Sequence, residues 1–317
     1  MSHNQTFRIA QREHVEKRVR ELNRRSDDIK SRLATTLKKL WVPERPLAVI
    51  SNLDIFQDLR IRFPNFTEAL DIFEANAIGL AKYGLPFEAS PILLHGEPGL
   101  GKTLFASELG RVMGLPYFEI SMATMTASFA LSGGSIQWSE GGVGFIANSL
   151  ADSSVGNPIF LIDEIDKQSG GFRYNPISPF YSLLEQHSAK KFKDEALEIE
   201  LDASKVIWIA TANYLDSVPE PILSRMRIID IVRPNEAQMR NVVMSIYAGF
   251  KINKPYGQFF DPEIPEPTME RLVNKNPREA RIAIDEGCLK AIRDGRSSLL
   301  TKDLPVEKKE KQHVGFI

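Results

Sequence analysis

The sequence contains a single cysteine, Cys288, among 317 residues, which excludes an intramolecular disulfide and indicates a reducing compartment. No apolar run approaches the roughly 18 residues that a membrane-spanning helix requires, and residues 1–14 lack the apolar core of a secretory signal. The formal net charge of −1 excludes a global field directed at nucleic acid or at an anionic membrane. There is no HExxH motif and no cysteine–histidine spacing typical of a metal site. We therefore expect a cytoplasmic protein that contacts no membrane.

Positive charge is concentrated near the start of the chain, where residues 1–45 hold twelve Lys or Arg against six Asp or Glu. Apolar residues recur there at spacings of three and four, which predicts an amphipathic helix that Pro43 and Pro46 end. We interpret residues 1–60 as a basic helical arm that packs on its own domain or on a neighbouring subunit. A nucleic-acid-binding arm is the alternative, but acidic residues interleave with the basic ones.

Residues 61–233 alternate short β-rich runs with helical stretches, which predicts an α/β domain with a parallel five-stranded sheet covered by helices on both faces. The β-rich runs are PILLH (91–95), YFEI (117–120), PIFLID (158–163), VIWIAT (206–211) and IIDIV (228–232). Residues 234–302 show only helical patterns and are expected to form a small all-helical second domain. Residues 303–317 form a charged tail.

The segment GEPGLGKT directly follows a predicted strand, opens a predicted helix and matches the phosphate-binding pattern GxxxxGK followed by Ser or Thr. Glycines let successive backbone N–H groups turn toward phosphate oxygens, and the helix N-terminus adds the positive end of its dipole. Lys102 is expected to supply a positive charge to the terminal phosphates, and Thr103 to ligate Mg²⁺. The expected nucleotide-binding residues are Gly96, Glu97, Pro98, Gly99, Leu100, Gly101, Lys102 and Thr103.

Acidic and amide side chains follow two further predicted strands. Asp163 ends the apolar run IFLID, and in such sheets ligands bind at the carboxyl ends of the strands. We expect Asp163 to hold Mg²⁺ together with Thr103, and Glu164 to polarise the attacking water. Asn213, after VIWIATA, is expected to orient that water; a turn-forming asparagine is the alternative.

Three arginines are placed to stabilise the charge that develops during phosphoryl transfer, a role that a neighbouring subunit often supplies. Arg225 and Arg227 lie in PILSRMRII, and Arg278 lies in NPREARIAI. Surface ion pairing is the alternative for each of them.

The order of GEPGLGKT, IFLIDEIDK, IATAN, SRM and NPREAR resembles that of the AAA+ ATPases. Over roughly residues 65–300 the sequence resembles the ATPase module of the Lon proteases, most closely in FKDEALEIELDASKVIWIATANYLDSVPEPILSRM. The resemblance implies a Mg²⁺- and ATP-dependent ATPase that assembles as a homohexameric ring with nucleotide between subunits. It also implies catalytic roles for Glu164, for Asn213 as the sensor-one residue, for Arg225 as the arginine finger and for Arg278 as the sensor-two arginine. Arg227 replaces an acidic residue of Lon and is the alternative finger.

The resemblance also bears on the glycine-rich stretch SGGSIQWSEGGVG, residues 132–144. It aligns QWSEGGVG with a loop that faces the central channel of Lon rings, so Trp138 takes the place of the substrate-gripping aromatic. The glycines are expected to form a flexible frame for this side chain. The alternative is that Trp138 packs on its own domain.

These observations predict a ring-forming, Lon-like ATPase without its own protease domain, because no Ser-Lys catalytic region is present. It would remodel, unfold or thread protein substrates, directly or for a separately encoded effector. The alternative is a nucleotide switch or a nucleic-acid loader that uses the basic arm.

Overall fold

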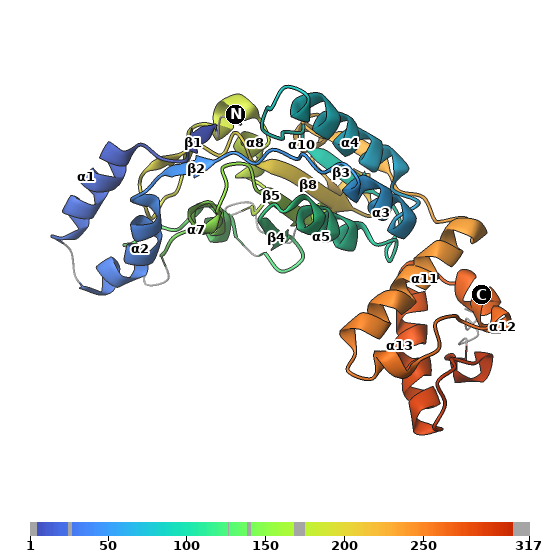
Figure 1. Ribbon diagram of the computed structural model, residues 1–317. Coiled ribbons are helices and arrows are strands. Elements are labelled where there is room, and N and C mark those ends of the chain that lie inside the picture. Colours follow the sequence, from blue (N-terminus) through green and yellow to red (C-terminus); the bar gives the residue numbers. More distant parts are fainter. Residues whose placement is uncertain (1–4, 25–26, 126, 138–140, 168–174, 307–317) are drawn as a thin grey trace, which may run out of the picture. The chain divides into compact units, whose positions relative to one another are not determined.

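The chain folds into two compact units, and the first is built around a sheet with helices on both sides (Figure 1). The computed structural model describes residues 5–24, 27–125, 127–137, 141–167 and 175–306. The first unit comprises Met1–Arg60, Phe66–Pro98 and Lys102–Val232. The second comprises Ile61–Asn65, Gly99–Gly101 and Arg233–Ile317.

The central sheet has five parallel strands in the order β4-β5-β8-β3-β9, which confirms the predicted α/β fold. Its strands are β3 (Ile92–His95), β4 (Tyr117–Ser121), β5 (Ile159–Asp163), β8 (Ile207–Ala212) and β9 (Arg227–Asp230). The central strands β5 and β8 are almost entirely apolar because helices bury both of their faces.

The register of the strands brings several carboxyl ends to one edge of the sheet. His95, the last residue of β3, pairs with Ala212, the last residue of β8. Next to them, Ile162 of β5 pairs with Ala210. The residues that follow these three strands therefore lie close together, whereas Arg227 begins β9 at the opposite edge.

Both faces of the sheet are covered by helices. On one face, Phe145 of α7 packs against Phe160, and Phe180 of α8 packs against Trp208. On the other face, α5 packs against the sheet. A Cβ atom added to Gly110 of this helix would lie 3.7 Å from the side chain of Ile159. The α-helices between residues 50 and 226 are α3 (Ile55–Arg62), α4 (Thr67–Ala81), α5 (Lys102–Met113), α6 (Phe129–Ser132), α7 (Phe145–Asp152), α8 (Phe180–Leu183), α9 (Gln186–Ala189) and α10 (Glu220–Leu223).

The N-terminal segment forms two helices, α1 (Arg12–Leu22) and α2 (Asp27–Leu40), where the sequence pattern predicted one. α1 ends at the C-cap Asn23, a residue with low helix propensity. Both helices pack on their own unit, because their apolar residues are buried in the same cluster as β5 and β8. These residues are Val15, Leu22, Leu33, Leu37 and Leu40.

Two small antiparallel pairs were not predicted, because strands of two or three residues are too short to show an alternating pattern. One joins β1 (Thr6–Arg8) to β2 (Glu44–Pro46). The other joins β6 (Phe192–Lys193) to β7 (Glu200–Leu201).

The second unit has a core formed by α11 (Glu236–Asn253), α12 (Glu266–Val273) and α13 (Pro277–Arg293). α11 and α13 each begin with a capping box, in which the side chains of Asn235 and Asn276 accept backbone N–H groups of the first turn. Short 3₁₀ helices among the described residues include η1 (Ile165–Lys167), η3 (Leu215–Ser217), η4 (Gly257–Phe259) and η5 (Thr301–Asp303). Within the described part of the chain, no helix combines the length and apolar character needed to cross a bilayer.

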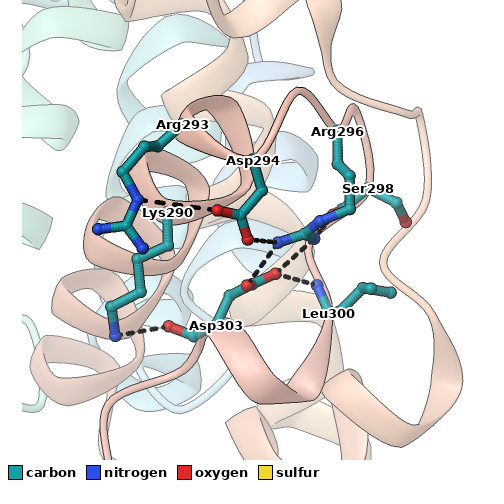
Figure 2. Close-up of polar contacts among 7 residues, drawn as sticks. All are labelled: Lys290, Arg293, Asp294, Arg296, Ser298, Leu300 and Asp303. Atoms are coloured by element: carbon teal, nitrogen blue, oxygen red, sulfur yellow. Dashed lines mark hydrogen bonds and ion pairs between the residues drawn. The ribbon is translucent and has the colours of Figure 1, made fainter.

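A buried carboxylate, Asp303, fixes the end of the second unit (Figure 2). Arg296 donates to both of its oxygens, with Nη2–Oδ1 and Nη1–Oδ2 distances of 2.7 and 2.8 Å, and the N–H of Leu300 donates to Oδ2. Lys290 reaches the Asp303 carbonyl at 3.0 Å. The hydrogen bond from Arg296 holds the pKa of Asp303 below its ordinary value.

We expect Asp303→Asn to lower the free energy of unfolding by about 2 kcal/mol at neutral pH. The amide leaves one acceptor oxygen and turns an NH₂ group toward the guanidinium donors. Because the folded pKa is depressed, the stabilisation is present above the ordinary carboxyl pKa and is lost as pH falls through the folded value. Urea unfolding over a pH series measures both effects.

Asp294→Asn is the matched control, since Asp294 accepts from the same Arg296 at 2.9 Å but is exposed. It should change stability much less. Equal losses for the two variants would contradict the assignment of stability to the buried carboxylate.

Candidate active site

The loop between β3 and α5 has the backbone of a phosphate-binding turn. Gly99 and Gly101 have φ angles of 86° and 93°, in the left-handed region that side chains disfavour. α5 begins at Lys102, immediately after the loop, so its first N–H groups are directed at the same place. The glycines of the motif are therefore required by backbone conformation.

Lys102 is buried and joins this loop to the end of β8. Its Nζ donates to the carbonyl oxygens of Gly96 and Glu97 at 2.6 and 3.0 Å, and to Oδ1 of Asn213 at 2.8 Å. Lys102 and Asn213, which lie far apart in the sequence, are thus in direct contact. The ammonium group is held within the loop by neutral oxygens, from which it can turn to an incoming phosphate.

Asp163 is the centre of a second group of contacts at the same edge of the sheet. Its Oδ1 accepts from the hydroxyls of Thr103 at 2.8 Å and Thr211 at 2.7 Å. A carboxylate and a hydroxyl in contact fit Mg²⁺, which prefers a few protein oxygens and takes its other ligands from phosphates and water. Thr103 and Asp163 would hold the ion. No group of three or more His, Cys, Asp or Glu suited to a metal occurs among the residues that the structure describes.

Glu164 has a φ of 53°, which is unusual for a residue with a side chain. Its backbone N–H donates to the hydroxyl of Thr211 at 2.9 Å, and this contact helps to hold the unusual conformation. Such backbone conformations cluster at active sites. Thr211 therefore positions both Asp163 and Glu164, a role that the sequence analysis missed. Its signal in the sequence is a hydroxyl in the otherwise apolar strand IWIATA.

Asp166 is a second residue at this edge that the sequence analysis did not single out. It is buried, and its Oδ2 accepts the N–H of Tyr214 at 3.3 Å. The ammonium of Lys167 lies 4.8 Å from the centre of the Tyr214 ring. These contacts tie the turn after β5 to the turn after β8, on which Glu164 and Asn213 are carried.

Arg225 and Arg227 lie at the other end of the strands. Arg227 pairs with Ile92, the first residue of β3, whereas the phosphate loop follows the last residue, His95. Arg225 donates to the Pro221 carbonyl, and Arg227 donates to Glu68 at 3.1 Å. The structure therefore does not bring either arginine together with Lys102 of the same chain.

Two predicted residues are not placed with this group. Arg278 lies in the first turn of α13 and belongs to the second unit. Trp138 lies outside the described residues.

Comparisons with known proteins agree with this geometry. The model of the family named "ATPase family associated with various cellular activities (AAA)" matches residues 92–233. The chain is 36% identical over 140 residues to the mitochondrial Lon protease homolog of Mus musculus, covering 44% of this chain and 15% of the relative. It is 27% identical over 231 residues to the Lon protease of Clostridioides difficile, covering 69% and 29%. The chain thus spans less than a third of the length of these relatives.

Among solved structures, the chain is similar to two mutants of RuvB from Thermotoga maritima. A proline-to-glycine mutant has a TM-score of 0.51 at 13% identity, and the alignment covers 75% of this chain and 67% of the RuvB chain. An alanine-to-serine mutant has the same TM-score at 14% identity, with coverages of 78% and 71%. At these identities the likeness concerns the fold alone.

Proposed function

Because residues 92–233 form an ATPase domain of the AAA family, we propose that this protein hydrolyses Mg²⁺-ATP to unfold or thread protein substrates as a ring of identical subunits. The observation that carries the proposal is the convergence at one sheet edge. Lys102 contacts Asn213 there, and Thr103 contacts Asp163. This arrangement supports the proposal, because it brings together side chains suited to binding phosphate, holding Mg²⁺ and orienting water.

In this proposal each side chain has a separate role. Lys102 binds the terminal phosphates, and Thr103 and Asp163 hold Mg²⁺, which when bound neutralises charge on the phosphates. Glu164 polarises the attacking water, and Asn213 orients it. These roles require the side chains to lie close together, and the register of β3, β5 and β8 supports this because it aligns the ends of these strands.

The proposal of a ring-shaped assembly is supported by the location of Arg225, the proposed arginine finger. Arg225 precedes β9, at the ends of the strands opposite the phosphate loop, and its guanidinium donates to the Pro221 carbonyl of its own segment. A head-to-tail ring would bring it to the nucleotide of a neighbouring subunit. Arg227 is the alternative, and Arg278 is proposed as the sensor-two arginine.

A protein substrate is favoured over nucleic acid by two observations. The curated relatives are Lon proteases, whose name states an action on protein. Basic residues of the N-terminal segment also form ion pairs with acidic residues of the same segment, as Arg8 does with Glu44 and Arg12 with Glu16. The excess of basic residues in the segment keeps nucleic acid as an outcome that the test must distinguish.

The proposal predicts that ATP turnover rises when a permanently unfolded polypeptide is added, and stays unchanged with single-stranded or duplex DNA. Phosphate release at saturating ATP measures turnover, and the Lys102→Ala variant gives the background. Stimulation by DNA and none by the polypeptide would replace the proposal with a nucleic-acid-handling function.

We further propose that Trp138 grips the extended polypeptide. Trp138→Ala should leave the melting temperature and basal turnover unchanged, since exposed sites alter stability by only about 0.5 kcal/mol. It should abolish the stimulation by polypeptide. A core tryptophan would instead cost roughly 3–5 kcal/mol on truncation, so a fall of many degrees in melting temperature would show that Trp138 is structural.

A further inference from the structure

The two ends of the glycine-rich segment 132–144 lie against each other. The N–H of Gly134 donates to the carbonyl of Gly142 at 3.0 Å. A Cβ on Gly144 would overlap the backbone of Leu131 and Gly133. Gly133 also has a φ of 81°, in the left-handed region. Close packing therefore requires glycine at Gly144, and both close packing and backbone conformation require it at Gly133.

Asp194 is buried where these ends meet, and it accepts three backbone N–H groups. Its Oδ2 accepts from Gly144 at 2.8 Å, and its Oδ1 accepts from Ala196 and Leu197 at 3.0 and 2.9 Å. At the other end of the segment, a Cβ on Gly133 would lie 2.6 Å from Oδ1 of Asp194. A single carboxylate thus accepts a hydrogen bond from one end of the segment and lies close to the backbone of the other.

Both oxygens of Asp194 are needed as acceptors. Burial raises the pKa of Asp194 to about 6, and the N–H groups of Leu197, Gly144 and Ala196 oppose that shift. The side chain is therefore ionised at neutral pH and offers two acceptor oxygens to three donors. An asparagine at this position would offer one oxygen and would turn an NH₂ group toward a backbone N–H.

The turn that carries Asp194 is itself held from two sides. The N–H of Glu195 donates to the Ser132 carbonyl at 2.9 Å. From α1, Arg18 donates to the Ala196 carbonyl at 2.9 Å and pairs with Glu198 at 2.7 Å, and its side chain is 5% exposed. The N-terminal helix therefore supports the same turn that contacts the glycine-rich segment.

We propose that Asp194 is a positioning residue that fixes both ends of the glycine-rich segment and so sets how this segment meets a polypeptide substrate. The effect of Asp194 on how the segment meets a substrate rests on the proposed function. The packing of Asp194 against Gly133 and Gly144, here called the clamp, stands independently and has its own measurement.

The test compares Asp194→Asn with Asp202→Asn by hydrogen–deuterium exchange and by ATP turnover on the full chain. Asp202 is the matched control, because it accepts one backbone N–H, that of Ser204 at 2.9 Å, and lies on the same stretch of chain. Asp194→Asn should accelerate exchange in peptides spanning 133–146 and leave the central strands β5 and β8 unchanged. It should lower polypeptide-stimulated turnover by about tenfold or more, with basal turnover retained, because small misplacements of a contact have effects of this size.

Two glycine substitutions test the same clamp if Asp194→Asn fails to fold. Gly133→Ala should reproduce its effects, because the added Cβ meets the Asp194 carboxylate. Gly142→Ala is the matched control, since a Cβ there meets nothing within 4 Å. Equal exchange in Asp194→Asn and Asp202→Asn, or faster exchange throughout the first unit, would overturn the clamp. Faster local exchange with normal stimulation would overturn the positioning role. If the wild type shows no stimulation, the proposed function fails while the exchange data still decide the clamp.

Discussion

Replacing Lys102 by alanine should weaken ATP binding by about 100-fold or more, because a buried charge that faces the phosphates contributes roughly 2–5 kcal/mol. Lys102 is buried, and it bridges the loop carbonyls to Asn213, so alanine removes both the charge and the link between the two elements. A fluorescent ATP analogue titrated into the protein measures the affinity.

Glu164→Gln should have the opposite pattern. The variant should bind ATP with nearly unchanged affinity and hydrolyse it at least about 100-fold more slowly, the contribution expected of a positioned base. Glutamine keeps the shape of the side chain and the backbone contact to Thr211. The comparison of the two variants therefore separates binding from hydrolysis.

Lys205→Ala and Glu88→Gln are matched controls for these two substitutions. Lys205 and Glu88 form an ion pair of 2.8 Å in the first unit, away from the phosphate loop. Neither change should alter affinity or turnover. Equal loss of ATP binding in Lys102→Ala and Glu164→Gln would contradict the division of roles.

The second large effect concerns Arg225. Arg225→Ala should bind ATP but lose on the order of 1,000-fold in turnover, as expected for a cation that stabilises the transferring phosphoryl group. Equal mixtures of Arg225→Ala and Lys102→Ala subunits should recover roughly a quarter of wild-type turnover, because random mixing pairs an intact loop with an intact finger at that fraction of head-to-tail interfaces.

The mixing experiment needs proof of co-assembly, which native mass spectrometry of the mixture supplies. Each variant mixed with itself gives the baseline. No recovery in verified mixed assemblies would show that Arg225 does not act across an interface. Recovery that requires an intact Arg227 and not Arg225 would transfer the finger role to Arg227.

Much of the site was predictable because strand order and strand ends follow local patterns. Apolar runs such as IFLI predict buried strands, and parallel strands place their carboxyl ends at one edge, so the convergence of Lys102, Asp163 and Asn213 follows from their positions. Thr211 and Asp166 were missed because their importance lies in contacts between separate turns. Such contacts leave no spacing pattern in the sequence.

The glycine-rich segment shows a different limit. Its composition was taken to indicate a flexible frame, yet Gly133 and Gly144 are explained by packing against Asp194 and against each other. The partner carboxylate lies some fifty residues away on the turn between β6 and β7, two strands too short to be predicted. Glycine content alone does not distinguish a close approach of backbones from freedom of movement.

The most direct test of the central claim is whether a labelled, permanently unfolded polypeptide binds to the Glu164→Gln variant. Fluorescence anisotropy measures this binding with ATP, with ADP and without nucleotide. The Lys102→Ala variant and an equally labelled DNA strand provide the comparisons. If this protein uses ATP to act on proteins, the polypeptide should bind Glu164→Gln tightly only with ATP, and Lys102→Ala should not bind it. ATP-dependent binding of the DNA strand, with no binding of the polypeptide, would contradict the account.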